Sequence, residues 1–431
     1  MSTIDILLLV TSFIFFLGIG VPIAYSIGLS SLLTLLINID AIPAFTTLSQ
    51  RMATGLDSFA LLAIPFFIFA GQLMNRGGVA SRLIDMAKVL VGRLPGGLAY
   101  VNIIAAMLFG AISGSAAAAA SAIGGFMTGK MKKEGYDPGY SAAVNITSST
   151  TGLIIPPSNI LIVYSLASGG VSIAALFIAG YIPGILVGLV LMIVAGIYAK
   201  KKNYPVGESV KIKVAVKTFL RAIPSLLLLV IVIGGIIAGI FTATEASAIA
   251  VLYTLILAFV YKEITVKDLP EILLSTVNTT SIVMLLIGTS MGMSWVMSFE
   301  EIPQSVSAAL LSVSDNPIVI LLIINLILLF VGIFMDMTPA VLIFTPIFLP
   351  IAIDMGMHPI HFGIMMALNL SIGLCTPPVG SVLFIGCSVA GLSIQKVIKP
   401  LLPLFFAMIV VLFIIAYFPE LTLILPRWFG F

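Results

Sequence analysis

The chain has 431 residues, of which 60% are hydrophobic and only 9% are charged, and its formal net charge is +3. A soluble domain carries about 25% charged residues, so this composition excludes a water-covered surface and indicates a polytopic membrane protein whose solvent is the lipid bilayer. The basic residues form short clusters between apolar runs, a distribution that excludes a nucleic-acid-binding surface.

The first apolar stretch, residues 4–20, has neither a basic flank nor a small-residue cleavage site. We therefore interpret it as a retained membrane span rather than a signal peptide. The two cysteines, Cys375 and Cys387, both lie in apolar sequence and offer no disulfide framework or metal-binding spacing, so we expect them to be buried.

A shift of 221 residues aligns two halves of the chain. It places Gly152 on Gly373 and the Pro-Pro pair at 156–157 on the pair at 377–378, without gaps. The same shift pairs "LFGAI" (108–112) with "LFVGI" (329–333). An ordered series of matches at one offset predicts an internal duplication. We expect one repeat over about 2–200, a basic linker, and a second repeat over about 222–431.

Each repeat contains an apolar block that we interpret as a re-entrant hairpin. The block at 94–129 has 36 residues and basic clusters on both flanks, whereas two full spans need about 40 residues plus a turn. Its tip would lie near 113–120. The equivalent block at 303–352, with its tip near 332–340, has acidic flanks and no Lys or Arg between 299 and 395. The second hairpin should therefore enter from the opposite face of the membrane.

Opposite topologies in the two halves are the inverted-repeat signature of secondary transporters. The basic residues at 200–202 and at 396 and 399 would then be cytoplasmic, and both chain termini periplasmic. Proline removes a backbone donor, so each Pro-Pro pair predicts an unwound break in a membrane helix, at about 140–168 and 360–390. A simple kink is the alternative for either pair alone.

The expected fold is thus an all-α polytopic membrane protein of two inverted repeats, each with a re-entrant hairpin and a Pro-Pro-broken helix. The expected organisation is as follows: scaffold spans and an arm helix at 1–57; a first transport half at 58–170; scaffold spans, a cytoplasmic linker (200–221) and a second arm helix at 171–278; a second transport half at 279–395; and a C-terminal span at 396–431.

Polar residues are scarce, so their positions are informative. The first hairpin tip carries a Ser-Gly-Ser cluster in an alanine run, which close helix packing would explain only in part. The second tip carries Asp336, whose carboxylate is costly in a membrane unless it is paired with a cation or a proton, or solvated near the interface. Glu245 fits a helix N-terminus as well as a transport role. His358 and His361 make a poor metal site, so we expect loop or interfacial histidines.

Five motifs in order give the chain a family resemblance: "GAISGSAAAAASAIG", "IIPPSNILIVYS", "TATEASAIAVLY", "FMDMTPAVLIFTPIFLPIA" and "FGIMMALNLSIGLCTPPVGSVLF". Together they resemble, over essentially the whole chain, the large membrane subunit (DctM-like, SiaM-like) of tripartite ATP-independent periplasmic (TRAP) transporters. The resemblance implies a multi-pass protein of the bacterial inner membrane, working by an elevator motion. It also implies sodium as coupling ion and no organic cofactor. Its partners would be a separate small membrane subunit (DctQ-like) and a periplasmic substrate-binding protein (DctP-like).

The resemblance also implies the sites. Sodium should bind where each hairpin tip meets its broken helix, and substrate between the two tips. No arginine embedded in the membrane is available to hold a carboxylate. The implied sodium ligands are Ser113, Gly114, Ser115, Gly152, Pro157 and Ser158 at one site and Asp336, Thr338, Gly373, Thr376 and Gly380 at the other; the implied substrate ligands are Ser115, Asn145, Asn159 and Asn369.

The expected function is therefore sodium-coupled import of a small organic acid, with sialic acid as the first substrate and C4-dicarboxylates as the second. A stand-alone sodium/carboxylate symporter without a binding protein is the nearest alternative. An intramembrane aspartyl protease would need a second well-placed aspartate, and we expect no enzyme. A channel is the remaining class, although no repeated selectivity-filter sequence occurs.

Overall fold

The computed structural model describes residues 3–207 and 211–431, so residues 208–210 of the expected linker lie outside the described part. Across the described residues the chain forms twenty α-helices and two short 3-10 helices, and its one bridge of strand type joins Pro95 to Val206. Within this described part, eight helical segments are long and apolar enough to cross a membrane. The protein therefore has the all-α polytopic architecture that its composition predicts.

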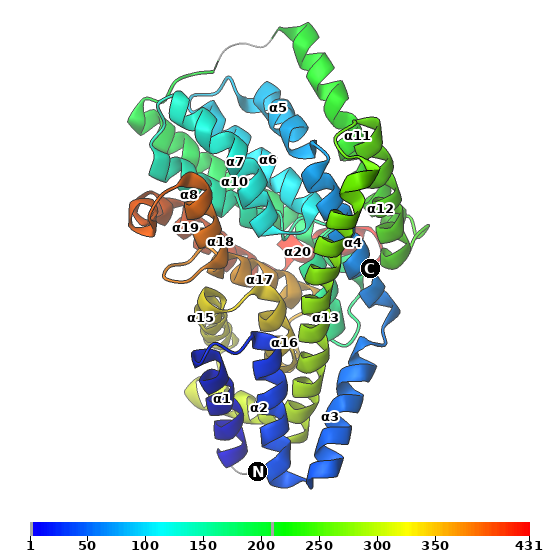
Figure 1. Ribbon diagram of the computed structural model, residues 1–431. Coiled ribbons are helices and arrows are strands. Elements are labelled where there is room, and N and C mark those ends of the chain that lie inside the picture. Colours follow the sequence, from blue (N-terminus) through cyan, green and yellow to red (C-terminus); the bar gives the residue numbers. More distant parts are fainter. Residues whose placement is uncertain (1–2, 208–210) are drawn as a thin grey trace.

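Of the helices in the described residues, α1 to α10 belong to the first repeat and α11 to α20 to the second; Figure 1 shows their arrangement. The first ten are α1 (Thr3–Gly18), α2 (Ile23–Asn38), α3 (Ala41–Leu56), α4 (Ala63–Arg76), α5 (Val79–Val91), α6 (Gly97–Ser113), α7 (Ala116–Lys133), α8 (Pro138–Thr151), α9 (Asn159–Ala167) and α10 (Ile173–Lys202). The second ten are α11 (Ile212–Ile237), α12 (Ala243–Val260), α13 (Leu269–Phe299), α14 (Ile302–Val313), α15 (Pro317–Phe334), α16 (Met337–Asp354), α17 (Pro359–Gly373), α18 (Ser381–Ala390), α19 (Ile394–Tyr417) and α20 (Glu420–Trp428).

The helices confirm the duplication. The starts of α7 and α16, of α8 and α17, and of α10 and α19 are each 221 residues apart. The α6–α7 hairpin lies in the upper half of the molecule in Figure 1, and the α15–α16 hairpin lies in the lower half. The two hairpins thus enter from opposite ends, as inverted repeats require.

The repeats differ at two places. The second hairpin begins at Pro317 and not at 303, because 302–313 form the separate helix α14 and Asn316 caps α15 through a hydrogen bond from Ile318 N–H. In the first repeat α3 and α4 are separated by residues 57–62. The corresponding part of the second repeat is continuous within α13, a helix of 31 residues.

Local capping explains several helix starts. Asp137 caps α8 by accepting a hydrogen bond from Tyr140 N–H, and Pro138 occupies the first turn. At the start of α17, the His358 side chain accepts a hydrogen bond from Ile360 N–H, and Pro359 occupies the first turn. Glu245 completes a capping box with Thr242 at the start of α12, so its observed role is at a helix N-terminus. His361 is buried and not interfacial: its Nδ1 lies 2.8 Å from the Thr422 hydroxyl of α20.

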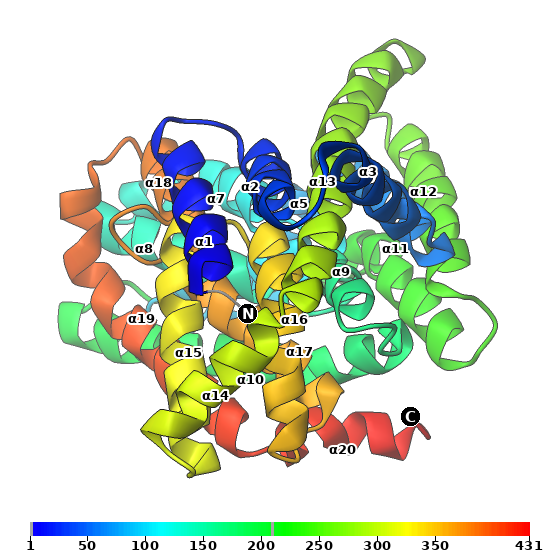
Figure 2. The same cartoon turned by 90° about the horizontal axis from the view of Figure 1, so that it is seen from below.

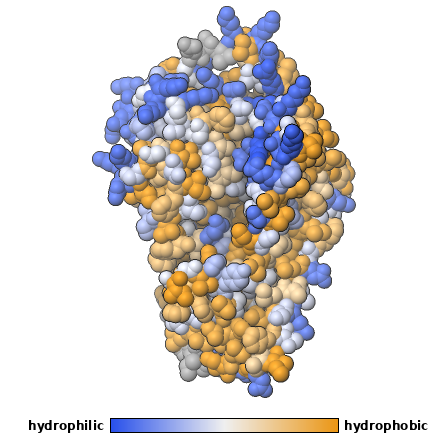
Figure 3. Space-filling view, viewed as in Figure 1, coloured by the Kyte–Doolittle hydropathy of each residue, from blue (hydrophilic) through white to orange (hydrophobic). Residues whose placement is uncertain are grey.

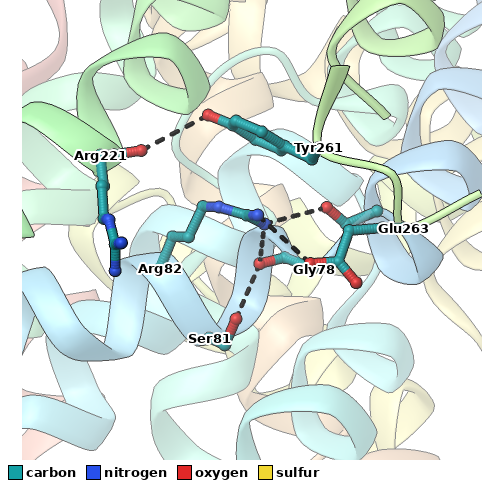
Figure 4. Close-up of polar contacts among 7 residues, drawn as sticks. Gly78, Ser81, Arg82, Arg221, Tyr261 and Glu263 are labelled. Carbon is teal, nitrogen blue, oxygen red and sulfur yellow. Dashed lines mark hydrogen bonds and ion pairs between the residues drawn. The ribbon is translucent and has the colours of Figure 1, made fainter. Parts of the chain in front are cut away.

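A polar cluster joins α5 to the turn after α12 (Figure 4). The Arg82 guanidinium donates to the carbonyl oxygens of Gly77 and Gly78, forms an ion pair with Glu263, and lies 3.6 Å from the centroid of the Tyr261 ring. The Tyr261 hydroxyl in turn donates to the Arg221 carbonyl of α11. This cluster ties the first repeat to two helices of the second.

The visible surface is divided by polarity. In Figure 3 hydrophilic residues gather over the upper half, whereas the lower half is mainly hydrophobic. Large apolar side chains such as Ile14, Ile193 and Phe330 are 60% or more exposed, which only a lipid solvent tolerates on this scale. Seen from below, α16 and α17 lie near the middle of the molecule and α19 runs along one edge (Figure 2).

Candidate functional site

Both Pro-Pro pairs lie in breaks between helices, as predicted. The α8 helix ends at Thr151 and α9 begins at Asn159, while α17 ends at Gly373 and α18 begins at Ser381. Both Pro-Pro peptide bonds are cis. The non-helical segments 152–158 and 374–380 leave several backbone carbonyls without helical partners inside the protein. The first break is buried throughout, whereas Pro378 and Val379 of the second are exposed.

Glycines bring each hairpin against its break. A Cβ built on Gly110 of α6 would lie 2.8 Å from the Gly152 Cα, and one on Gly332 of α15 would lie 3.1 Å from the Gly373 Cα. At the first tip, Gly114 has φ +62, and a Cβ built on it would lie 3.0 Å from the Asn159 amide nitrogen. Backbone therefore packs directly on backbone in both repeats, and no larger residue fits there.

The two hairpin tips meet in one cavity of about 310 Å³. Tip residues 113–115 of the first hairpin and Asp336 and Thr338 of the second line it together. Since the hairpins come from opposite ends, both tips lie within the molecule, as expected of re-entrant hairpins. The polar side chains that line the cavity are Gln72, Asn75, Ser113, Ser115, Asn159, Thr279, Asp336 and Thr338.

The cavity is polar and nearly uncharged. Asp336 is the one ionisable side chain among its lining residues, and it is exposed to the cavity at the N-terminal end of α16. The N-termini of two further helices also lie at the cavity. Ser115 is the N-cap residue of α7 and Asn159 is the first residue of α9, and both line the cavity. The positive ends of these dipoles favour a negative charge, while the carbonyls of the breaks favour a cation.

The structure brings six of the expected site residues into the cavity lining and places the others nearby or elsewhere. Ser113, Gly114, Ser115, Asn159, Asp336 and Thr338 line the cavity. Gly152, Pro157 and Ser158 belong to the buried first break; Gly373 is the last residue of α17, and Thr376 and Gly380 belong to the second break. The Ser158 hydroxyl donates to Leu153 O and the Thr376 hydroxyl donates to Ile372 O, so both side chains stabilise their own break.

Asn145 and Asn369, expected as substrate ligands, do not line the cavity. The Asn145 amide donates to Ala120 O of α7, and the Asn369 amide donates to the backbone and side-chain oxygens of Asn325 on α15. Each bond is 2.8 or 2.9 Å long, and both asparagines are buried. These amides tie each broken helix to its own hairpin.

Three cavity residues were missed from the sequence. Gln72 and Asn75 lie one turn apart on α4, and Thr279 lies on α13. The signal that could have found the first two is the polar i, i+3 pair in the otherwise apolar run "IPFFIFAGQLMN". Thr279 belongs to the polar run "NTTS" (278–281) within a long apolar helix.

The two broken helices contact each other. The Tyr164 hydroxyl of α9 donates to Pro359 O at the start of α17, at 2.6 Å. The Cys375 thiol lies 3.6 Å from Ile146 O of α8. Both cysteines are buried, as expected. The contact makes the two breaks parts of a single packed unit.

Helix α10 packs on the first break through Gly180 and Gly184 and on α6 through Gly188, three glycines spaced by four residues. Cβ atoms on Gly180, Gly184 and Gly188 would lie 2.2 Å from Ile154 O, 2.4 Å from Ile155 Cγ1 and 2.2 Å from Met107 Sδ, respectively. In membrane proteins, such a row of small residues allows helix backbones to approach each other closely. It buries the first break more deeply than the second.

The sequence matches a family model over residues 10–421, the DctM component of the tripartite ATP-independent periplasmic transporters. This match spans both repeats and every residue of the cavity.

Curated relatives match over nearly their full length. A Salmonella typhimurium protein, YgiK, is 59% identical over 99% of this chain and 98% of its own. The C4-dicarboxylate TRAP transporter large permease DctM of Pseudomonas aeruginosa is 40% identical over 94% of each chain. The sialic acid TRAP transporter large permease SiaM of Vibrio cholerae is 38% identical over 95% of this chain and 96% of its own.

A solved structure shares the fold. The YdaH transporter of Alcanivorax borkumensis superposes with a TM-score of 0.64 and 14% sequence identity, over 91% of this chain and 89% of that one. At this identity the likeness concerns the fold alone.

Proposed function

Because the chain belongs to the DctM component family of TRAP transporters and is a large permease subunit, we propose that it imports a small organic acid together with sodium. The single observation that supports this most is the cavity between two hairpin tips that enter from opposite ends. Inverted repeats place substrate and coupling ions at such a meeting point. Its relatives are permeases, so the chain is not an enzyme.

Sodium would bind where each tip meets its break. The first site would use the 113–115 tip with Gly152, Pro157 and Ser158, and the second would use Asp336 and Thr338 with Gly373, Thr376 and Gly380. Carbonyls released by the breaks, together with hydroxyls, supply the oxygen ligands that sodium prefers. The Asp336 carboxylate adds the one negative charge in the cavity lining.

Transport would occur by an elevator motion in the bacterial inner membrane. Residues 58–170 and 279–395 would move as the transport unit, against a scaffold of 1–57, 171–278 and 396–431. A separate small membrane subunit would complete the scaffold, and a periplasmic binding protein would deliver the substrate. Both termini would be periplasmic. Sialic acid is the first substrate we propose and C4-dicarboxylates are the second, in line with the names of relatives.

Reconstitution tests the proposal. The chain, co-purified with its proposed small subunit, is placed in proteoliposomes with the proposed binding protein outside, and uptake of labelled organic acid is measured. Uptake should require an inward sodium gradient and should saturate. Flux that is unaffected by replacing sodium with potassium would contradict sodium coupling. Robust uptake by the lone chain would instead favour a stand-alone symporter.

A further inference from the structure

Another cavity, of about 440 Å³, lies where α5, α11 and the turn after α12 meet. Its size falls in the range of about 300–1,000 Å³ that is typical of small-ligand sites. Arg82 lines it from α5 and Arg221 from α11, and Figure 4 shows Arg221 extending from its helix toward α5. The other lining residues are Ser81, Asp85, Thr218, Pro224 and Tyr261. The cavity therefore offers both signs of charge, unlike the cavity between the hairpin tips.

The charges of this lining are only partly balanced within the protein. Arg82 already has Glu263 and two carbonyl oxygens as partners. In the described part of the chain, by contrast, neither the Arg221 guanidinium nor the Asp85 carboxylate forms a hydrogen bond or an ion pair. The hydroxyls of Ser81 and Tyr261 donate to carbonyl oxygens, which leaves the Thr218 hydroxyl available. One cation, one carboxylate and one hydroxyl thus remain for a ligand.

The cavity lies at the depth of lipid headgroups. No charged residue occurs between Arg221 and Glu245, and about 20 apolar residues are enough to cross the hydrocarbon core. Arg221 is therefore the last charge before a membrane span. Tyr261 follows α12 directly, at the kind of position where aromatic residues mark the interface. Leu220 and Leu227 are exposed on the face of α11 beside the cavity, where acyl chains would cover them.

We propose that this cavity binds the headgroup of a phospholipid with a primary ammonium group, as in phosphatidylethanolamine. The phosphate oxygens accept hydrogen bonds from the Arg221 guanidinium and the Thr218 hydroxyl, and the ammonium donates to the Asp85 carboxylate. A zwitterionic headgroup therefore matches the remaining charges one for one. An anionic headgroup would leave Asp85 beside the phosphate without a cation, and a quaternary ammonium has no N–H to donate. The site is separate from the transported substrate and requires only that the chain lies in a membrane.

Binding of defined lipids to the purified permease tests the headgroup preference. Native mass spectrometry compares dioleoyl-phosphatidylethanolamine, -phosphatidylglycerol and -phosphatidylcholine, each added alone to delipidated protein. The ethanolamine lipid should bind with an apparent Kd about tenfold lower than either of the others, the effect of one hydrogen bond between charged groups. Equal affinities would overturn the proposal.

The headgroup without acyl chains separates a lipid from a soluble ligand. Glycerophosphoethanolamine carries the same phosphate and ammonium groups but cannot cover Leu220 and Leu227. It should not bind at the concentration at which the lipid saturates the site. Binding as tight as that of the lipid would show a site for a soluble phosphate compound and overturn the assignment to a lipid.

Two substitutions distinguish the ammonium subsite from the phosphate subsite. Asp85→Asn should abolish the preference for the ethanolamine lipid over the glycerol lipid, whereas Arg221→Gln should weaken binding of all three lipids. Both side chains are exposed, so both variants should unfold like the wild type. Lys213→Gln and Asp315→Asn are the matched controls, because these residues are also exposed but lie outside the lining. A preference that survives in Asp85→Asn overturns the proposal.

Protection of an added thiol shows where the lipid binds. Ser81→Cys places a thiol in the lining without removing a proposed ligand, and both native cysteines are buried. In nanodiscs, its reaction with N-ethylmaleimide should slow several-fold when phosphatidylethanolamine replaces part of the phosphatidylcholine, whereas Lys213→Cys should react at the same rate in both. Equal rates for Ser81→Cys in the two membranes would place the lipid elsewhere and overturn the site.

Discussion

Gly110 and Gly152 pack backbone to backbone, so closely that a Cβ on Gly110 would lie 2.8 Å from the Gly152 Cα. Gly110→Ala should therefore separate α6 from the first break. We expect a destabilisation of about 1–3 kcal/mol, as for other overpacked sites, together with loss of uptake. Thermal unfolding of the purified protein and proteoliposome uptake measure the two effects.

The control for this variant lies on the neighbouring helix. A Cβ on Gly125 of α7 would meet nothing within 4 Å. Gly125→Ala should be neutral or slightly stabilising, because alanine favours a helix by about 1 kcal/mol over glycine. Equal behaviour of the two variants would contradict the role of the close approach.

The glycines of α10 should differ in their tolerance of alanine. A methyl group on Gly180 meets the carbonyl oxygen of Ile154 in the break, whereas one on Gly184 meets the side chain of Ile155, which can rotate. Gly180→Ala should lower the unfolding temperature more than Gly184→Ala. Gly234→Ala on α11, where nothing lies within 4 Å, serves as the reference. The reverse order would show that the first break is not held by α10.

Asp336→Asn should abolish sodium-dependent uptake while the protein still folds. The substitution keeps the size of the side chain but removes the one charge in the cavity lining. Asp354→Asn, at the exposed end of the same helix, is the matched control and should transport normally. Uptake as a function of sodium concentration measures the effect, and an unchanged sodium dependence in Asp336→Asn would rule out the assignment.

Arg82 should contribute more to stability than Arg76. The Arg82 side chain is 19% exposed and has four partners, whereas the Arg76–Glu271 pair is 39% and 70% exposed. Arg76→Ala should cost no more than about 1 kcal/mol, the usual value for a surface ion pair. Arg82→Ala should cost about 2 kcal/mol or more, because it leaves two carbonyl oxygens and the Tyr261 face uncovered. Thermal unfolding of both variants compares them directly.

Labelling of single added cysteines can test the orientation of the chain in the membrane. Cys375 and Cys387 are buried, so an added surface cysteine should be the main site of labelling. Lys201→Cys should react with a membrane-impermeant maleimide only after cells are opened, and Asp315→Cys should react in spheroplasts that remain intact. Labelling of Lys201→Cys in intact spheroplasts would place the basic end of α10 outside the cytoplasm and reverse the proposed topology.

The repeat plan could be predicted because it depends on strong local signals. The 221-residue offset, the two Pro-Pro breaks and the hairpin tips all come from residues with few alternative uses in a membrane, such as Pro156 and Asp336. The start of the second hairpin was missed, although the run "SDNP" (314–317) between α14 and α15 is a signal for the start of a helix: Asn316 caps α15 and Pro317 occupies its first turn.

The cavity wall formed by α4 and α13 was also missed, because the polar pair Gln72 and Asn75 does not by itself show which neighbour it faces. Whether Gln72 faces substrate, lipid or another helix depends on how α4 packs against α12 and α6, and single-chain patterns do not encode that packing. Asn145 and Asn369 show the opposite error, because both were expected to bind substrate and instead join helices. Polar residues beside a break were natural candidates for ligands, yet buried amides in membranes serve equally well to join helices.

The continuous helix α13 and the bent pair α3–α4 are two solutions to the same segment of a duplicated chain. Residues 278–283 of α13, which include the run "NTTS", correspond to the bend at 57–62. The two repeats thus give this segment two different shapes, one with a change of direction and one as a continuous helix. The cavity wall at Thr279 therefore lies at the position in α13 where the first repeat changes direction.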